Sequence, residues 1–230
     1  MTTLIVIAKE CIPGKVKTRL HPPYSLEQAA DIASASLHDT LATLADVPAT
    51  RRVLCFDGTT PPPAAAAYEV VHQVDGDLDE RLAAIFDDVD GDAVLVGMDT
   101  PQLDAAAVAA AFAPWPEGVD AWFGPASDGG FWLLGLRAMP GRGDLIRGVP
   151  MSRDDTGTIQ RARLVDAGLG IRDLEALRDI DDAEALAAVV ARIPRSRTAA
   201  AARASGVAIR TVATERTHGT PSATRPETRS

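Results

Sequence analysis

Short runs of β-branched and aliphatic residues alternate with longer segments of helical periodicity along most of this chain. The first run, Leu4–Ala8, is followed by apolar residues that recur every three or four positions from Leu26 to about Ala45. Strands that are separated by helices of about 10 to 20 residues are joined by crossover connections and therefore lie parallel. The sequence predicts an α/β domain with a mostly parallel central sheet flanked by helices.

The same patterns predict the remaining elements. Further strands are expected over residues 52–56, 70–74, 93–97, 121–123 and 131–136. Further helices are expected over residues 78–89, 104–112, 155–167 and 182–193. Because the strand at 93–97 contains no polar side chain, we expect it at the centre of the sheet with both faces covered.

Composition fits one globular domain and a tail. The 230 residues are 46% hydrophobic and only 4% aromatic, so Ala, Val, Leu and Ile must build the core. Residues 1–194 are predicted to form the domain. Residues 195–230 consist mainly of Ala, Thr, Arg, Ser and Pro without apolar periodicity or aromatic residues, and we expect them to be a disordered tail.

Charge is distributed unevenly between these two parts. The tail contains seven Arg and two Glu and so has a net charge of +5. Because the whole chain has a net charge of −9, residues 1–194 have a net charge of −14. A domain with this charge repels nucleic acid, so nucleic acid is not expected as a partner. The sequence contains no indication of an oligomeric state.

The cellular location is predicted from the absence of membrane-spanning and signal segments in the sequence. No apolar run approaches the about 20 residues that a membrane-spanning helix needs. The chain enters its first apolar run without a basic segment or a cleavage site, so we expect a strand there and not a signal peptide. Cys11 and Cys55 form neither a disulfide framework nor a zinc spacing, which favours reduced thiols in a soluble, cytoplasmic protein.

A basic loop follows the first predicted strand, where open parallel sheets bind their ligands. It carries four cations, Lys9, Lys15, Lys17 and Arg19. Together with the main-chain amides of the Pro13-Gly14 turn and with Thr18, they suit the oxygens of a nucleotide diphosphate or triphosphate. The loop lacks the spacing of a P-loop, and a solvated basic loop is the alternative.

Asp99 leaves the central strand at the same predicted edge of the sheet. A carboxylate in this crevice is placed to bind Mg²⁺ or Mn²⁺ together with substrate phosphates. Alternatively, Asp99-Thr100-Pro101 is a turn or a helix entry. The basic loop at the same edge favours the metal site.

Two later loops carry polar groups that suit a sugar or an acceptor. The first, between the last two predicted strands, contains Ser127, Asp128, Gly129 and Gly130, which permit close approach of a ligand and hydrogen bonds to its hydroxyls. A tight hairpin explains the same residues without a ligand. The second loop, residues 151–158, contains Thr156 and is a candidate acceptor loop.

A run of acidic residues precedes the last predicted helix. Asp182 has the character of a helix N-cap, with Glu184 in the first turn. Asp179 or Asp181 is in addition a candidate to reach a metal ion held by Asp99. The spacing alone favours a helix cap at this segment over a metal site.

Taken in order, the motifs resemble a bacterial family known as domain of unknown function 2064, or selenodomain-associated transferase 1. They are Lys9-x3-Pro13-Gly14-x-Val16-Lys17-Thr18-Arg19-Leu20, Gly76-Asp77-Leu78, Gly97-x-Asp99-x-Pro101, Gly124-Pro-Ala-x-Asp128-Gly-Gly-Phe131 and Asp179-Ile-Asp181. The resemblance covers about residues 3–193. It implies a Rossmann-like GT-A fold, as in nucleotide-diphospho-sugar transferases, that binds a nucleotide and a divalent cation.

More distant relatives, by the Lys-x-Arg-Leu loop and the later Asp-x-Asp, are the 2-phospho-lactate guanylyltransferases and the molybdenum cofactor nucleotidyltransferases. In them the residue matching Asp99 binds metal and the residue matching Asp181 lies nearby, which raises Asp181 as a metal ligand beside Asp99. Their Gly-rich opening loop is replaced here by residues 12–15, and their Thr-Pro after the last Asp by Asp182-Ala183.

These observations lead to three functional hypotheses. The first is a divalent-metal-dependent transferase that takes a nucleotide-diphospho-sugar donor and an unidentified small-molecule acceptor, with Asp99 and Asp128 as catalytic residues. The second is a nucleotidyltransferase that joins a nucleoside triphosphate to a phosphorylated acceptor and releases pyrophosphate. The third is a nucleotide-binding protein without turnover.

Overall fold

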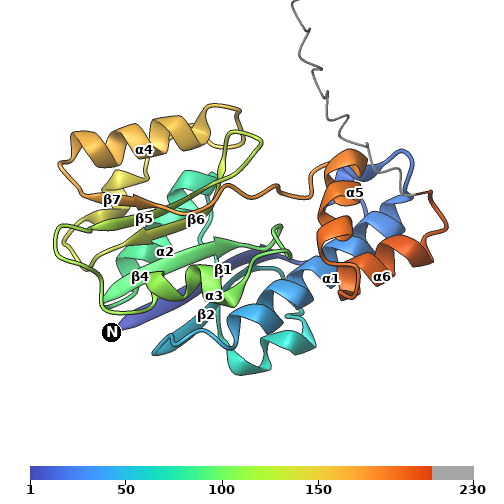
Figure 1. The fold of residues 1–230 in the computed structure, drawn as a ribbon, viewed down its shortest axis with the longest axis horizontal. Helices are drawn as coiled ribbons and strands as arrows, with labels where there is room; N and C mark the ends of the chain where they lie inside the picture. The colour runs from blue at the N-terminus through green and yellow to red at the C-terminus, as the bar shows by residue number, and fades with distance from the viewer. Residues whose placement is uncertain (209–230) are drawn as a thin grey trace, which may run out of the picture.

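The computed structural model describes residues 1–208, which form a central sheet with helices packed on both faces (Figure 1). The strands are β1 (Thr2–Lys9), β2 (Arg51–Asp57), β3 (Glu69–His72), β4 (Asp92–Gly97), β5 (Ala121–Pro125), β6 (Phe131–Leu136) and β7 (Ile171–Asp173). The helices are α1 (Leu26–Leu44), α2 (Leu78–Asp88), α3 (Ala105–Val108), α4 (Thr156–Asp166), α5 (Ala183–Arg192) and α6 (Arg197–Ala204). Short 3₁₀ turns are η1 (Thr18–Leu20), η2 (Pro63–Ala67), η3 (Ala109–Ala111) and η4 (Arg142–Leu145).

The seven strands form one sheet in the order β3-β2-β1-β4-β6-β5-β7. Strand β6 runs antiparallel to β4 and β5, whereas all other neighbours are parallel. The prediction of a mostly parallel α/β sheet is confirmed. Strand β4 is central, as its uninterrupted apolar sequence predicts, and its carboxyl end lies beside that of β1.

Each face of the sheet is covered by its own apolar layer. On one face, alternate residues of β1 and β4, such as Leu4 and Val96, pack with Leu37 and Leu41 of α1. On the other face, Ile5 and Leu95 pack with α2, and strands β5 and β6 pack with α4. This alternation is the two-residue period of strands buried on both faces.

Helix starts are fixed by local sequence. Ser25 and Gln28 form a capping box at the start of α1, in which each side chain bonds the main-chain amide of the other. Asp77 and Glu80 form the corresponding box at the start of α2, which orients the first turn of that helix toward the site edge of the sheet.

The tail predicted to be disordered from residue 195 begins instead with helix α6. Ala199 and Ala202 are fully buried and pack into an apolar cluster with α1 and α5, while Asp39 of α1 accepts hydrogen bonds from Arg197 N, Thr198 N and Thr198 Oγ1. Small alanine side chains let the helices approach closely, so this contact needs no large apolar residue. Residues 209–230 of the predicted tail lie outside the described residues.

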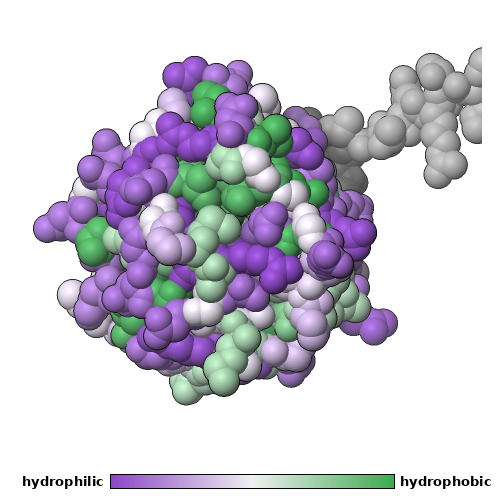
Figure 2. Space-filling model, turned by 90° about the vertical axis from the view of Figure 1, so that its left-hand side faces the viewer, coloured by the Kyte–Doolittle hydropathy of each residue, from purple (hydrophilic) through white to green (hydrophobic). Residues whose placement is uncertain are grey.

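On the side of the molecule that Figure 2 shows, hydrophilic side chains cover most of the surface, and apolar side chains gather toward the middle of the view. None of the helices in residues 1–208 has the length and apolar character that crossing a membrane requires. Cys11 and Cys55 are both free thiols, as their spacing predicts.

Candidate active site

A cavity of about 800 Å³ opens at the carboxyl ends of β1 and β4. This volume is in the range of small-molecule sites. The predicted site residues that line it are Lys9, Lys17, Thr18, Arg19, Asp99, Asp128, Gly130, Thr156 and Asp181. The cavity thus brings together the basic loop, Asp99 and the later acidic motif. Pro13, Gly14, Ser127 and Gly129 do not line it.

Lys17 lies between the two predicted metal ligands. Its Nζ atom is 2.9 Å from Asp99 Oδ2 and 3.1 Å from Asp181 Oδ1, and its side chain is 6% exposed. Burial alone would lower the pKa of Lys17, but attraction by Asp99 and Asp181 outweighs burial and raises it. In this structure the single positive charge of Lys17 therefore offsets part of the negative charge of these two carboxylates.

Arg19 behaves differently from Lys17. Its guanidinium lies 3.6 Å from Asp181 Oδ2, but the side chain is 75% exposed at the cavity rim. An exposed guanidinium keeps its fork of donors available for an anion. Arg19 is thus placed to receive phosphate oxygens without breaking a buried contact.

Pro13 and Gly14 belong to the turn that carries this loop. Lys15 N donates to Ile12 O at 3.0 Å, and Gly14 adopts a φ of +77°, which favours glycine. Both residues lie outside the cavity, so the structure gives them a supporting position, not the direct phosphate contact that the sequence predicts.

Two carboxylate oxygens at the cavity are buried without a hydrogen-bond partner. They are Asp99 Oδ1 and Asp179 Oδ1. Burial, reinforced by the charges of Asp99 and Asp128, raises the pKa of Asp179 to about 7. The sequence favoured Asp181 over Asp179 as the residue beside Asp99. Asp179 also lines the cavity, and its burial, which cannot be read from the sequence, is what raises its pKa.

The carboxylates on this side of the cavity form a possible donor set for a divalent cation. Carboxylate oxygens are the ligands that Mg²⁺ and Mn²⁺ prefer, and Mg²⁺ is commonly held by one or two carboxylates together with substrate phosphates. Asp99 and Asp181 supply two carboxylates, and Asp99 Oδ1, which has no hydrogen-bond partner, has its lone pairs available to coordinate a cation. Within residues 1–208 no group of three His, Cys, Asp or Glu is arranged as a complete metal site. The donor set therefore fits a cation that substrate phosphates help to coordinate.

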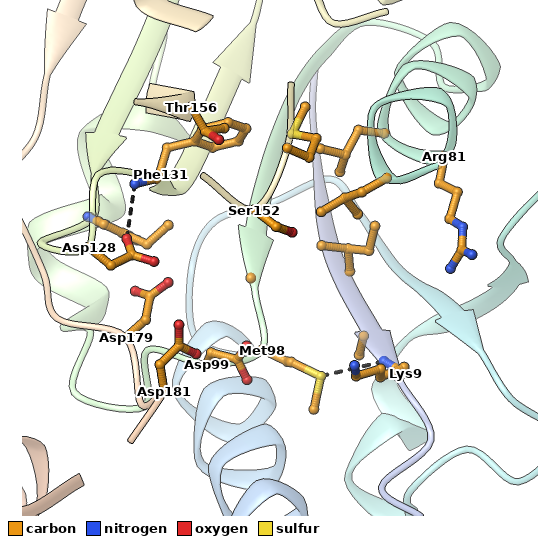
Figure 3. Close-up of a pocket in the computed structure, with 18 of the residues that line it drawn as sticks. Lys9, Arg81, Met98, Asp99, Asp128, Phe131, Ser152, Thr156, Asp179 and Asp181 are labelled. Carbon is orange, nitrogen blue, oxygen red and sulfur yellow. Dashed lines mark hydrogen bonds between the residues drawn. The ribbon is translucent and has the colours of Figure 1, made fainter. Parts of the chain in front are cut away.

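The loop between β5 and β6 presents Asp128 to the cavity and uses its other residues for support (Figure 3). Asp128 Oδ1 accepts a hydrogen bond from Gly130 N at 2.9 Å, which fixes the carboxylate. Ser127, predicted to contact substrate, instead donates from N and Oγ to Leu177 O at 2.8 and 3.1 Å. Gly129 has a φ of +92°, and a Cβ there would overlap with the carbonyl oxygen of Asp154. Ser127 and Gly129 thus hold the loop in place.

Thr156 lines the cavity, but its hydroxyl is already engaged. It donates to Pro150 O at 2.8 Å and accepts from Arg153 N at 3.1 Å. These bonds shape the 151–155 segment, which places Ser152 over the cavity with a φ of +59° (Figure 3). Ser152 belongs to the loop that was predicted to be an acceptor loop, but it was not singled out there, because a serine in a polar loop carries no distinctive signal.

The wall opposite the carboxylates was also missed by sequence reasoning. Arg81 of α2 donates to Gly76 O at 2.8 Å and pairs with Asp57 Oδ2 at 3.1 Å, and Gln73 lies beside them. The signal that could have found this wall is the Gly76-Asp77-Leu78 motif, which was noted only for the family resemblance.

The fold of this chain is similar to the folds of several solved proteins that are named as transferases or synthetases. A crystal structure of a Desulfovibrio desulfuricans G20 protein, provisionally named a nucleotide-diphospho-sugar transferase, is 27% identical, with a TM-score of 0.76 over 89% of this chain and 95% of that chain. A Methanothermobacter thermautotroptrophicus nucleotidyl transferase is 13% identical, with a TM-score of 0.51 over 89% of this chain and 99% of that chain. A CMP:2-keto-3-deoxy-manno-octonic acid synthetase complexed with CTP is 12% identical, with a TM-score of 0.51 over 84% of this chain and 98% of that chain. The last two show the fold alone.

None of the curated proteins matches the sequence. A family model described as "Uncharacterized protein conserved in bacteria (DUF2064)" matches residues 40–153. This match and the fold shared with the D. desulfuricans protein confirm the resemblance that the ordered motifs predict. Residues 40–153 thus match the DUF2064 family model, and the fold is that of the GT-A nucleotide-diphospho-sugar transferases.

Proposed function

We propose that this protein is a divalent-metal-dependent transferase that binds a nucleotide-diphospho-sugar and passes the sugar to a small-molecule acceptor. The observation that carries the proposal is the grouping of Lys17, Asp99 and Asp181 on one side of the cavity, near the carboxyl ends of the adjacent parallel strands β1 and β4. Cations and carboxylates that meet in such a crevice suit a diphosphate and its counter-ion. The name given to the D. desulfuricans protein supports the same class of donor.

The basic loop is assigned to the diphosphate. Lys17 and Arg19 bind its oxygens, and Lys9 at the end of β1 adds a third positive charge on the same wall. Lys17 is occupied by two carboxylates in the described structure, so it becomes available for phosphate when another cation offsets their charge. Arg19 is available without such a change, because it is exposed.

Asp99 and Asp181 are assigned to Mg²⁺ or Mn²⁺. When bound, such an ion supplies neutralisation of the charge that develops on the departing diphosphate. The chain's contribution is to hold both carboxylates at one point: Asp99 by the end of β4, and Asp181 through the segment in which Ile180 N donates to Asp99 O at 3.1 Å.

Asp128 is assigned to the acceptor. One carboxylate oxygen is fixed by Gly130 N, which leaves the other free to take a hydrogen bond or a proton from an acceptor hydroxyl. Catalysis then consists of positioning the acceptor against the donor sugar and of stabilising the leaving group.

Phosphorus NMR of reaction mixtures tests this proposal. The full chain is incubated with MgCl₂, a protein-free small-molecule extract as a source of acceptors, and either nucleoside-diphosphate glucoses or nucleoside triphosphates. Release of a nucleoside diphosphate from a sugar nucleotide, absent in Asp99→Asn, is the expected result. Release of pyrophosphate from a triphosphate would replace the proposal with nucleotidyl transfer. Binding without release of either product would support a nucleotide-binding protein without turnover.

A further inference from the structure

Gly97, the last residue of β4, is a glycine that neither its backbone nor its packing requires. Its φ lies outside the left-handed region that favours glycine, and a Cβ built on it would meet no atom of the described residues within 4 Å. Gly129 and Gly157 differ, since a Cβ on either would overlap with main-chain atoms of a neighbouring loop. The missing side chain of Gly97 therefore leaves empty space inside the cavity.

The floor around this space is apolar. Gly97 pairs in register with Ile7 of β1, and Leu95 lies two residues earlier on the same face of the sheet. Phe131 and Met151 line the cavity above this floor. A bare phosphate gains nothing from such a surface and loses its hydration there.

Carboxylates border the apolar floor on one side. Asp99 follows Gly97 by two residues, and Asp128 lies beside Phe131, as Figure 3 shows. Within residues 1–208 no basic side chain lies within ion-pair distance of Asp128. Carboxylates of this kind accept hydrogen bonds from hydroxyl groups.

A saturated ring with hydroxyls on its edge matches this combination. Its C–H face can lie on Ile7, Leu95 and the bare backbone of Gly97, while its hydroxyls reach the carboxylates. On the basis of the proposed function, we propose that Gly97 is a specificity-determining residue. It leaves room for the sugar ring of the nucleotide-diphospho-sugar to lie on the floor of the cavity, with the diphosphate held outside this space by the basic loop.

The inference separates the sugar from the rest of the donor, so it predicts a selective loss. A methyl group added where a bound ligand already fills the space weakens binding, and a tenfold loss of affinity corresponds to about 1.4 kcal/mol. Gly97→Ala should weaken binding of a nucleoside-diphosphate glucose by about tenfold and Gly97→Val by more. Binding of the matching nucleoside diphosphate, which lacks the ring, should change by less than about twofold.

The test is calorimetric titration of the full-length wild type, Gly97→Ala and Gly97→Val with ADP, CDP, GDP and UDP and with their glucose conjugates, all in MgCl₂. Thermal unfolding without ligand controls for the fold. Alanine at a strand position with an ordinary φ should leave the midpoint equal to or above that of the wild type. A structural role for Gly97 would instead lower it.

Each outcome decides a different claim. Selective loss of the glucose conjugates, with an unchanged or raised unfolding midpoint, supports the inference. Equal losses for diphosphates and conjugates, or no loss for either, overturn it and leave the proposed function standing. Failure of the wild type to bind any of these nucleotides would overturn the proposed function, and the inference with it.

Discussion

Lys17 Nζ lies 2.9 Å from Asp99 Oδ2, which places a buried cation from the loop after β1 against a carboxylate at the end of β4. The two residues are brought together because β1 and β4 are parallel neighbours whose carboxyl ends meet. Lys17 also contacts Asp181, so one ammonium group offsets two carboxylates. Lys17 is therefore the buried counter-ion that Asp99 and Asp181 share, while Arg19 contacts Asp181 from the exposed rim.

Lys17→Met should destabilise the metal-free protein by about 2 kcal/mol, because it leaves Asp99 without its counter-ion and leaves Asp181 with the exposed Arg19 alone among the contacts described above. MgCl₂ should restore part of this loss, since a bound cation replaces the missing charge. Urea unfolding of both proteins with and without MgCl₂ measures the effect. Arg19→Met is the matched control and should lose less than about 1 kcal/mol, because Arg19 is 75% exposed. A loss in Lys17→Met that MgCl₂ leaves unchanged would argue against a cation site at these carboxylates.

Asp179 should make stability fall as pH rises through the acid range. Its pKa is raised from 3.8 to about 7 in the folded chain, mainly by burial. Between these values the folded chain holds a proton that the unfolded chain has released, so the free energy of unfolding decreases with rising pH. Asp179→Asn cannot release a proton and should remove this part of the slope. Thermal unfolding midpoints of both proteins between pH 4 and about 8 test this, and parallel profiles would contradict it.

Arg142→Met should destabilise the fold by about 3 kcal/mol without altering ligand binding. Arg142 is 4% exposed, and its guanidinium donates to the carbonyl oxygens of Phe86, Val89 and Gly91 at the end of α2. Burial lowers its pKa, but these carbonyls would be left unsatisfied without it. Arg161→Met is the control, because Arg161 only pairs with Asp173 at the surface. Similar unfolding free energies for the two variants would be inconsistent with this role.

Asp39→Ala should cost about 1–2 kcal/mol, because Asp39 binds the first amides of α6. A chain that ends at residue 194 should lose more than this, since it also uncovers the apolar cluster that Ala199 and Ala202 complete. Urea unfolding of the full chain, Asp39→Ala and the shortened chain measures both effects. Equal stability of all three would restore the boundary predicted from composition.

Periodicity predicted the strands and helices of the sheet because their apolar positions are large and regularly spaced. It missed α6, in which the buried residues are alanines, and β7, which has three residues and an exposed Arg172 and Asp173. The central place of β4 followed from the apolar sequence of its residues 93–97. The helix predicted over 104–112 is divided into α3 and η3, since a run of alanines does not determine where an α-turn tightens.

The candidate site was predicted in part for a related reason. The loop after β1 carries Lys17, and Asp99 follows β4. Because β1 and β4 are parallel neighbours, the sheet brings these two residues together. Asp181 joins them because the adjacent Ile180 bonds the main chain of Asp99. Ser127 and Gly129 have the residue types of a ligand loop, but their contacts are to Leu177 and Asp154, which are distant in sequence. The raised pKa of Asp179 comes mainly from its burial, and burial depends on the whole fold.

The central claim is that Asp99 and Asp181 hold a divalent cation beneath the diphosphate of a sugar nucleotide. The most direct test is calorimetric titration of the wild type and Asp99→Asn with nucleoside-diphosphate glucoses, in MgCl₂ and in EDTA, with Asp173→Asn as a control outside the cavity. We predict binding to the wild type and to Asp173→Asn that weakens at least about tenfold in EDTA, and weak, metal-independent binding to Asp99→Asn. Equal affinity in MgCl₂ and EDTA, or an unchanged metal response in Asp99→Asn, would contradict the claim.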